Sequence, residues 1–274
     1  MPSIQTADIQ TYYEIHGRGA PLVFIHGGWV SRRMWQPQVE HFCHNYQVIT
    51  YDIRGHGQTG GSPRRRYSVE LFADDLSLLL KALGVEKPAV CGLSLGGMVA
   101  QAYANRHPDN LSALVLADTA VSSALTLSDK LTAYVLAPKW LFMGLVRLLG
   151  IERYTRFAFW YAARSRSKEW VGLDASVIQY EKEEMLRFDT DEFNKIFAAM
   201  YDFRLQPLAD IEAKTLVING QYESRAVLRH TEKILELVPD AAAVTIPDAG
   251  HTSSLENPAA FNGVLEAFLH EVGL

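Results

Sequence analysis

Short hydrophobic runs recur in the first and last parts of the chain, and amphipathic segments alternate with them. A strand buried on both faces of a parallel sheet is apolar throughout, whereas a half-exposed strand alternates apolar and polar residues. Residues 9–15 alternate in this way. Continuous apolar runs occupy 22–25, 48–51, 89–93, 111–117, 215–218 and 243–246. The pattern predicts an α/β fold with a mostly parallel sheet.

Segments with apolar residues at helical spacing connect these strands. Ser68 is a candidate N-cap for a helix that Gly84 ends, because serine accepts hydrogen bonds from free terminal amides and glycine adopts the left-handed conformation that follows many helices. Within it, apolar residues recur three or four positions apart at Phe72, Leu76, Leu79, Leu80 and Leu83. We expect further helices at about 33–45, 98–106, 225–237 and from 258 onward.

The alternation of strands and helices stops between residues 121 and 205. This segment has helical spacing, no strand pattern and many aromatic residues: Tyr134, Trp140, Phe142, Tyr154, Phe157, Phe159, Trp160, Tyr161 and Trp170. We predict a core domain of residues 1–120 and 206–274 and a helical cap, or lid, of residues 121–205. The residues expected to contact a substrate are Trp29, Tyr134, Trp140, Phe157 and Trp160.

Composition and charge exclude several classes of function. The chain has 274 residues, 48% of them hydrophobic, and a net charge of −5. This length accommodates one α/β core with an insertion, and the mild acidity gives no reason to expect a nucleic-acid partner. Arg64–Arg66 form the one basic cluster, which we interpret as a solvated loop. Cys43 and Cys91 have neither CxxC nor metal-ligand spacing, so we predict no disulfide and no metal site.

The chain has no pattern typical of export or membrane insertion. Its first eight residues contain neither a basic start nor an apolar run. The most apolar stretch, 133–150, is interrupted by Pro138, Lys139 and Arg147 and falls short of a membrane span. We therefore expect a cytoplasmic protein without a membrane partner, either a monomer or a homodimer.

The sequence Gly-Leu-Ser-Leu-Gly-Gly at 92–97 lies between a predicted strand and a predicted helix. It matches the G-x-S-x-G nucleophile elbow, in which a sharp turn exposes a serine hydroxyl and small neighbours allow strand and helix to approach. The hydroxyl of Ser94 then lies at the start of a helix, where amides favour negative charge. We predict that Ser94 is a nucleophile.

A second glycine pair follows the buried strand 22–25. Gly27 and Gly28 permit backbone conformations that other residues avoid and can turn an amide toward a ligand. Beside a nucleophilic serine, such an amide would serve as an oxyanion donor together with the amide that follows the serine. We predict Gly28 and Leu95 as these donors, with Trp29 as the alternative to Gly28.

A serine hydroxyl needs a neighbouring base to remove its proton, and histidine has a suitable pKa. His251 follows the last predicted strand and Gly250, on the side of the sheet where the carboxyl ends of parallel strands meet. The base needs a carboxylate to orient it. We favour Glu223, with Asp118 as the alternative acid, while Asp248 is so close to His251 in sequence that we expect it to cap the loop.

The loop Asp52-Ile53-Arg54-Gly55-His56-Gly57 carries further polar groups after a strand. We expect Asp52, Arg54 and His56 to hold loops together through hydrogen bonds rather than to take part in catalysis.

Four motifs in this order resemble the α/β-hydrolase superfamily: His26–Gly28, Asp52–Gly57, Gly92–Gly97 and Gly250–His251. The chain looks most similar to cap-bearing esterases and lactonases such as oxoadipate enol-lactonases. One departure leaves the acid open between two positions: that family usually has Asp where Glu223 stands, and some lactonases of the fold place the acid after the strand that here ends at Asp118.

The resemblance implies an eight-stranded, mostly parallel sheet and a serine hydrolase that cleaves a hydrophobic carboxylic ester or lactone through an acyl-enzyme, without metal or cofactor. A serine at the elbow argues against dehalogenase and epoxide hydrolase chemistry. The alternatives that remain are hydrolysis of a carbon–carbon bond, cofactor-free perhydrolysis and a slow-turnover small-molecule receptor.

Overall fold

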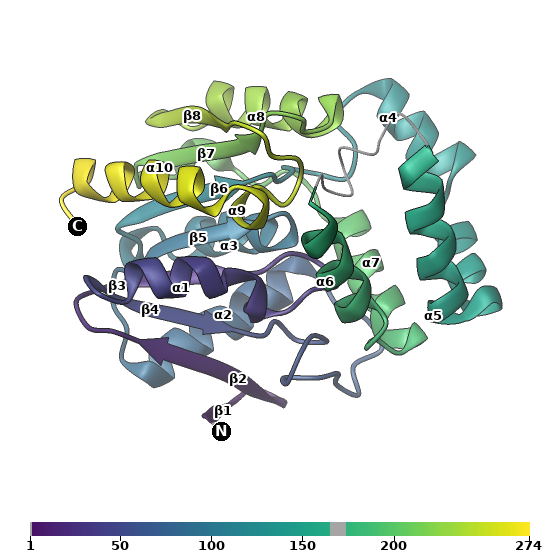
Figure 1. Ribbon diagram of the computed structural model, residues 1–274, viewed down its shortest axis with the longest axis horizontal. Helices are drawn as coiled ribbons and strands as arrows, with labels where there is room; N and C mark the ends of the chain where they lie inside the picture. Colours follow the sequence, from purple (N-terminus) through teal and green to yellow (C-terminus); the bar gives the residue numbers. More distant parts are fainter. Residues whose placement is uncertain (1, 165–173) are drawn as a thin grey trace.

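The computed structural model describes residues 2–164 and 174–274, which form one sheet and its flanking helices (Figure 1). The sheet has eight strands in the order β1-β2-β4-β3-β5-β6-β7-β8. Strand β1 pairs antiparallel with β2, and β2 with β4, whereas all other neighbours are parallel. The expected α/β fold is therefore confirmed. The strands are β1 (Ser3–Thr6), β2 (Ile9–His16), β3 (Ala20–Ile25), β4 (Tyr46–Tyr51), β5 (Ala89–Leu93), β6 (Ala113–Ala117), β7 (Thr215–Gly220) and β8 (Ala241–Ile246).

Helices cover both faces of the sheet because its central strands are apolar on both sides. In β3, Leu22 and Phe24 belong to one buried cluster while Val23 and Ile25 belong to the other, as expected for side chains that alternate across a strand. The first cluster includes residues of α1 (Gln36–Phe42) and α10 (Pro258–Glu271). The second includes residues of α2 (Val69–Leu83), α3 (Leu95–Arg106) and α8 (Arg225–Leu237).

The predicted ends of α2 are confirmed. The Ser68 hydroxyl accepts a hydrogen bond from the Leu71 amide at 3.1 Å, and Gly84 has a φ of 66°. Other boundaries differ. Helix α3 begins at Leu95, directly after Ser94, and the predicted helix at 33–45 is a 3₁₀ turn, η1 (Arg32–Trp35), followed by α1. Strand β1 was not expected, since four residues are too few to reveal a period.

In the described part of the segment between β6 and β7, four α-helices and a π-helical turn lie beside the edge of the sheet where the parallel strands end, and a short 3₁₀ turn, η5 (Leu208–Asp210), leads into β7 (Figure 1). No strand occurs among the described residues of this segment, as the sequence pattern predicted. We call these elements the insertion helices; the domain boundaries proposed for them from sequence stay a prediction. They are α4 (Leu127–Leu131), η3 (Thr132–Leu136), α5 (Lys139–Arg164), α6 (Ala175–Met185) and α7 (Thr190–Asp202).

Within the described parts of the chain, no single helix is long and apolar enough to cross a membrane. One pair of consecutive helical segments, Leu127–Leu136 and Lys139–Ala162, has the required length and composition when the two are taken together, but the chain bends by 45° between them.

A buried ion pair holds the loop after β4. The Arg54 side chain is fully buried and donates from Nε and Nη2 to the two carboxylate oxygens of Asp75, each at 2.7 Å. Its Nη2 also lies 2.9 Å from Asp8. The Asp52 carboxylate accepts hydrogen bonds from the amides of Arg32 and Gln58, each at 2.8 Å. The structural role expected for Asp52 and Arg54 is thus confirmed.

Replacing Arg54 by alanine will destabilise the fold because it leaves the buried Asp75 carboxylate without its cation. Removing one partner of a buried pair costs about 3–5 kcal/mol. The matched control is Arg106→Ala, since Arg106 pairs with Asp74 at 2.7 Å but both side chains are nearly half exposed, and such pairs contribute about 1 kcal/mol or less. Urea unfolding measures both variants, and equal losses would contradict the assignment.

Candidate active site

Ser94 occupies the turn between β5 and α3 in a strained backbone conformation. Its φ is 54° and its ψ is −114°, a combination that side-chain-bearing residues rarely adopt. Neighbouring groups hold it there: the Ser94 amide donates to the carbonyl of Ala117 at 2.9 Å, and the Thr119 hydroxyl donates to the carbonyl of Ser94 at 2.6 Å. The turn predicted from the glycine-rich motif is present.

The glycines of the motif allow α3 to lie directly against the sheet. A Cβ on Gly96 would lie 2.1 Å from the carbonyl oxygen of Ile25 in β3, and one on Gly92 would lie 2.2 Å from the carbonyl oxygen of Gly96. Both contacts are with backbone atoms and could not relax by rotation of a side chain. The helix therefore begins directly behind Ser94, with its free amide groups beside the hydroxyl.

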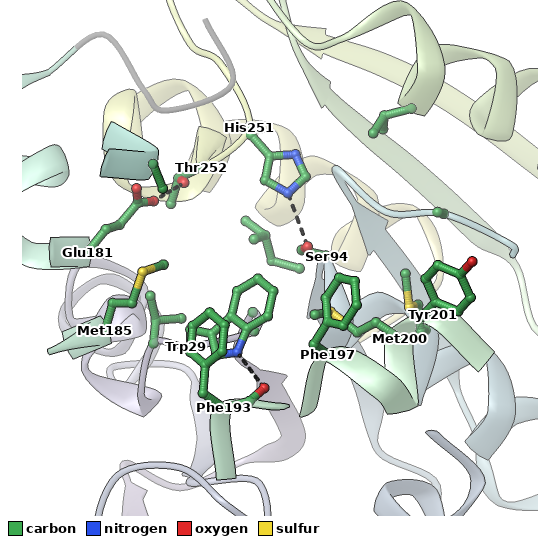
Figure 2. Close-up of a pocket in the computed structure, with 18 of the residues that line it drawn as sticks. Trp29, Ser94, Glu181, Met185, Phe193, Phe197, Met200, Tyr201, His251 and Thr252 are labelled. Carbon is green, nitrogen blue, oxygen red and sulfur yellow. Dashed lines mark hydrogen bonds between the residues drawn. The ribbon is translucent and has the colours of Figure 1, made fainter. Parts of the chain in front are cut away.

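His251 and Glu223 meet Ser94 from two other loops. The Nε2 atom of His251 lies 3.0 Å from Ser94 Oγ, and its Nδ1 lies 2.5 Å from Glu223 Oε2 (Figure 2 shows the first contact). The second oxygen of Glu223 accepts a hydrogen bond from the amide of Ser224. The three residues follow β5, β7 and β8, whose carboxyl ends lie at the same edge of the sheet.

Asp118, the alternative acid, follows β6 and has a different set of partners. Its carboxylate accepts hydrogen bonds from the amide of Gly220 at 2.8 Å and from the hydroxyl of Ser253 at 2.5 Å. It therefore joins the ends of β6 and β7 to α9 (Ser253–Glu256). Asp248 is exposed, and its amide donates to the side chain of Gln221. Of the three candidate acids, Glu223 is the one in hydrogen-bond contact with His251 Nδ1.

The charges around His251 favour its protonated form. Burial lowers the pKa of its imidazole, but the charge and hydrogen bond of Glu223, with smaller contributions from Asp118 and Glu181, raise it to about 9. Burial and the charge of Glu223 raise the pKa of Asp118 to about 7. For Glu223, burial is opposed by the charge and hydrogen bond of His251, and its pKa falls below the usual value.

A cavity of about 490 Å³ opens beside Ser94 and His251, between the sheet and the insertion helices. Its walls are mostly apolar, and aromatic rings from Trp29, α5 and α7 form much of them (Figure 2). The rings of Trp29 and Phe193 stack at 4.6 Å between centroids, and those of Phe142 and Phe197 stack at 3.8 Å. The cavity is large enough for a medium-sized organic molecule.

Four of the five residues expected to contact a substrate are not in the lining of this cavity, so the structure gives no support to these four as substrate contacts. Trp140 is 70% exposed, and Phe157 and Trp160 of α5 are exposed as well. Tyr134 packs edge-on against Tyr201 instead. Trp29 does line the cavity, and Trp170 lies outside the described residues.

Helical geometry accounts for much of the cavity lining. On α5 the lining residues Tyr154, Ala158 and Ala162 are four residues apart and Phe159 joins them, whereas the exposed Phe157 and Trp160 are not in the lining. On α7 the lining residues Phe193, Phe197, Met200 and Tyr201 also share one face. Their i, i+4, i+7, i+8 spacing is visible in the sequence. This spacing could have identified the cavity-facing residues of α7, whereas the number of aromatic residues could not.

The glycine-rich loop after β3 lies next to the start of α3. A Cβ on Gly28 would be 3.8 Å from the Cβ of Leu95, so the two residues predicted to donate to an oxyanion are neighbours. The Trp29 amide donates to Nε2 of His56 at 3.2 Å, and its indole N–H donates to the carbonyl of Phe193 at 3.3 Å. The amide of Trp29 therefore has a partner within the core, which favours Gly28 over Trp29 as the donor.

Among the described residues, no group of three or more His, Cys, Asp or Glu side chains is arranged to hold a metal ion. Cys43 and Cys91 are both free thiols.

Comparison with known proteins identifies the family. The model of the alpha/beta hydrolase fold family matches residues 20–258, and the chain belongs to this family. It is 27% identical to a protein of Azorhizobium caulinodans that bears the name of a carbamate hydrolase, RutD, over 99% of both chains. It is 24% identical to 3-oxoadipate enol-lactonase 2 of Acinetobacter baylyi, over 97% of this chain and 96% of that protein.

Solved structures agree. A malate-bound thermophilic esterase from Thermogutta terrifontis superimposes with a TM-score of 0.82 at 26% identity, covering 100% of this chain and 99% of the other. The enol-lactonase from Burkholderia xenovorans LB400 shares the fold, with a TM-score of 0.82 at 24% identity over 98% and 100% of the two chains. The resemblance drawn from the sequence motifs is confirmed, and hydrolysis is the reaction class that these relatives support.

The raised pKa of His251 should depend mainly on Glu223. In Glu223→Gln the imidazolium loses its hydrogen-bonded carboxylate, and we expect the pKa of His251 to fall by roughly one pH unit or more. Heteronuclear NMR titration of the histidine ring measures it, with His251→Ala identifying the resonance. Asp118→Asn, which removes a charge but no hydrogen bond to Nδ1, should lower the pKa less; the reverse order would contradict the assignment.

Proposed function

We propose that the protein is a serine hydrolase that cleaves a hydrophobic carboxylic ester or lactone through an acyl-enzyme. The observation that carries this proposal is the continuous contact from Ser94 Oγ through both ring nitrogens of His251 to Glu223, beside an apolar cavity. Such an arrangement can remove the serine proton and stabilise the imidazolium that forms. The esterases and lactonases among the similar proteins support the same reaction class.

In the first half of the proposed reaction, neutral His251 accepts the proton of Ser94 through Nε2. Ser94 Oγ attacks the substrate carbonyl carbon, and the amides of Gly28 and Leu95 donate to the resulting oxyanion. The start of α3 adds a favourable potential there, because its first amides have no partner within the helix. Amide donors of this kind contribute about 3–4 kcal/mol each to the stabilisation of the transition state.

In the second half, the imidazolium of His251 gives its proton to the leaving alcohol oxygen. The bond between the carbonyl carbon and that oxygen breaks and leaves the acyl group on Ser94. Water, deprotonated by His251, then attacks the acyl carbon. The bond from this carbon to Ser94 Oγ breaks, Oγ takes the proton back from His251, and the carboxylic acid leaves. The proposal needs neither a metal nor a cofactor. It requires neutral His251, so the proposed activity increases as pH rises toward the raised pKa of this residue, about 9.

Ser94→Ala should abolish ester hydrolysis, since no other group can form the acyl-enzyme in this scheme. The measurement is release of p-nitrophenol from p-nitrophenyl esters of increasing acyl length, with mass spectrometry of the trapped acylated protein. A matched control is Ser123→Ala, which removes a hydroxyl from the same cavity wall. Full activity in Ser94→Ala would overturn the mechanism, and a single burst without turnover in the wild type would indicate a receptor.

The identity of the acid can be tested by two neutral substitutions. Glu223→Gln should reduce kcat by about a thousandfold or more, as expected when the orienting carboxylate of such a histidine is lost. Asp118→Asn should cause a far smaller loss, because its partners are Gly220 and Ser253. Circular dichroism checks that both variants fold. A larger loss at Asp118 than at Glu223 would assign the role to Asp118.

A further inference from the structure

The carboxyl group of Glu181 lies in the wall of the same cavity and takes no direct part in the proposed proton transfers. Glu181 belongs to α6, and its Oε1 accepts a hydrogen bond from the Thr252 hydroxyl at 2.6 Å (Figure 2). Thr252 follows His251, so this contact places a carboxyl beside the proposed base. Burial raises the pKa of Glu181 to about 7, while the Thr252 hydrogen bond and the charge of His251 oppose that rise.

Around this carboxyl the cation among the described residues is the imidazolium of His251, which lines the cavity and is already hydrogen-bonded to Glu223. No described residue of the lining is lysine or arginine. The ammonium of Lys182, the next residue along α6, lies 5.1 Å from the ring centroid of Phe159, and Lys182 itself is not in the lining. His230 is in the lining, but burial lowers its pKa to about 4, so its ring is neutral near pH 7.

Aromatic rings form much of the rest of the wall, together with apolar side chains such as Met185 of α6. Trp29, Phe193 and Phe197 lie between Glu181 and Tyr201 in the cavity (Figure 2). The face of an aromatic ring attracts cations, and the attraction is worth about 2 kcal/mol or more once the cation has lost its water. One carboxylate among several rings is the chemistry that binds an ammonium group, whereas a purely hydrophobic ester would need only the rings.

We propose that the substrate is an ester with a positively charged nitrogen, which Glu181 and the aromatic rings of the cavity hold while the ester carbonyl lies at Ser94. This inference rests on the proposed esterase function and defines its substrate class. The positive charge of the ammonium group offsets the unfavourable desolvation of the Glu181 carboxylate. The carboxylate in turn replaces the water that the cation loses when it enters the cavity. An anionic group in the same place would be repelled by Glu181 and by Glu223.

Two pairs of substrates with the same shape test the proposal on each side of the ester bond. One pair is butyrylthiocholine and S-(3,3-dimethylbutyl) thiobutyrate. The other pair is p-nitrophenyl 6-(trimethylammonio)hexanoate and p-nitrophenyl 7,7-dimethyloctanoate. In each pair a trimethylammonium group replaces a tert-butyl group. The ratio of kcat/KM within each pair, divided by the ratio of their alkaline hydrolysis rates, isolates the effect of the charge in the protein.

We expect the wild type to prefer the cation by about tenfold or more in at least one pair. Glu181→Gln keeps an acceptor for Thr252 but removes the charge, so it should abolish the preference. The accompanying change in the pKa of His251 acts on both members of a pair and leaves their ratio unaltered. Glu183→Gln is the matched control, because Glu183 is exposed on the same helix and contacts Gln179. It should retain the preference.

Three outcomes would overturn the inference: no preference in either pair, an equal loss for both members of a pair in Glu181→Gln, or the same change in Glu183→Gln. None of these affects the proposed function, provided that hydrolysis of the neutral esters still depends on Ser94. If Ser94→Ala hydrolyses them as fast as the wild type, the proposed function fails instead, so the two failures are distinguishable.

Discussion

The close approach of α3 to the sheet is the constraint on which the site depends. Gly92 and Gly96 bring the helix within contact of β3 and β5, and the chain can turn from β5 into the helix only through the strained backbone of Ser94. That turn presents the Ser94 hydroxyl above the helix start. Because β5, β6, β7 and β8 are parallel, their following loops meet at the same edge and bring Asp118, Glu223 and His251 to it.

Much of this arrangement could be predicted from the sequence because it depends on local chemistry. The buried strands are apolar runs, the elbow requires small residues beside Ser94, and the position of His251 follows from the end of a strand. The sequence favoured Glu223 over Asp118 but left both open, since both follow parallel strands. The choice depends on which carboxylate reaches Nδ1, a distance that the chain order does not contain.

The cavity wall was harder to predict for a different reason. The aromatic residues of the insertion helices are numerous, but their number does not indicate direction: Trp140 and Trp160 face outward while Phe193 and Phe197 face the cavity. Glu181 gave no signal at all, because it stands in a run of charged residues typical of a solvated helix. Its burial results from the packing of α6 against the loop of Thr252, which only the tertiary structure reveals.

Trp29 has contacts on two sides of the site. Its backbone amide is tied to His56 in the core, while its ring stacks on Phe193 and its indole nitrogen bonds to the same residue of α7. Gly28, the proposed oxyanion donor, is its neighbour in the chain. The position of the proposed donor is therefore linked through one residue to both the core and α7, and the geometry of the oxyanion site depends on the packing of the insertion helices as well as on the sheet.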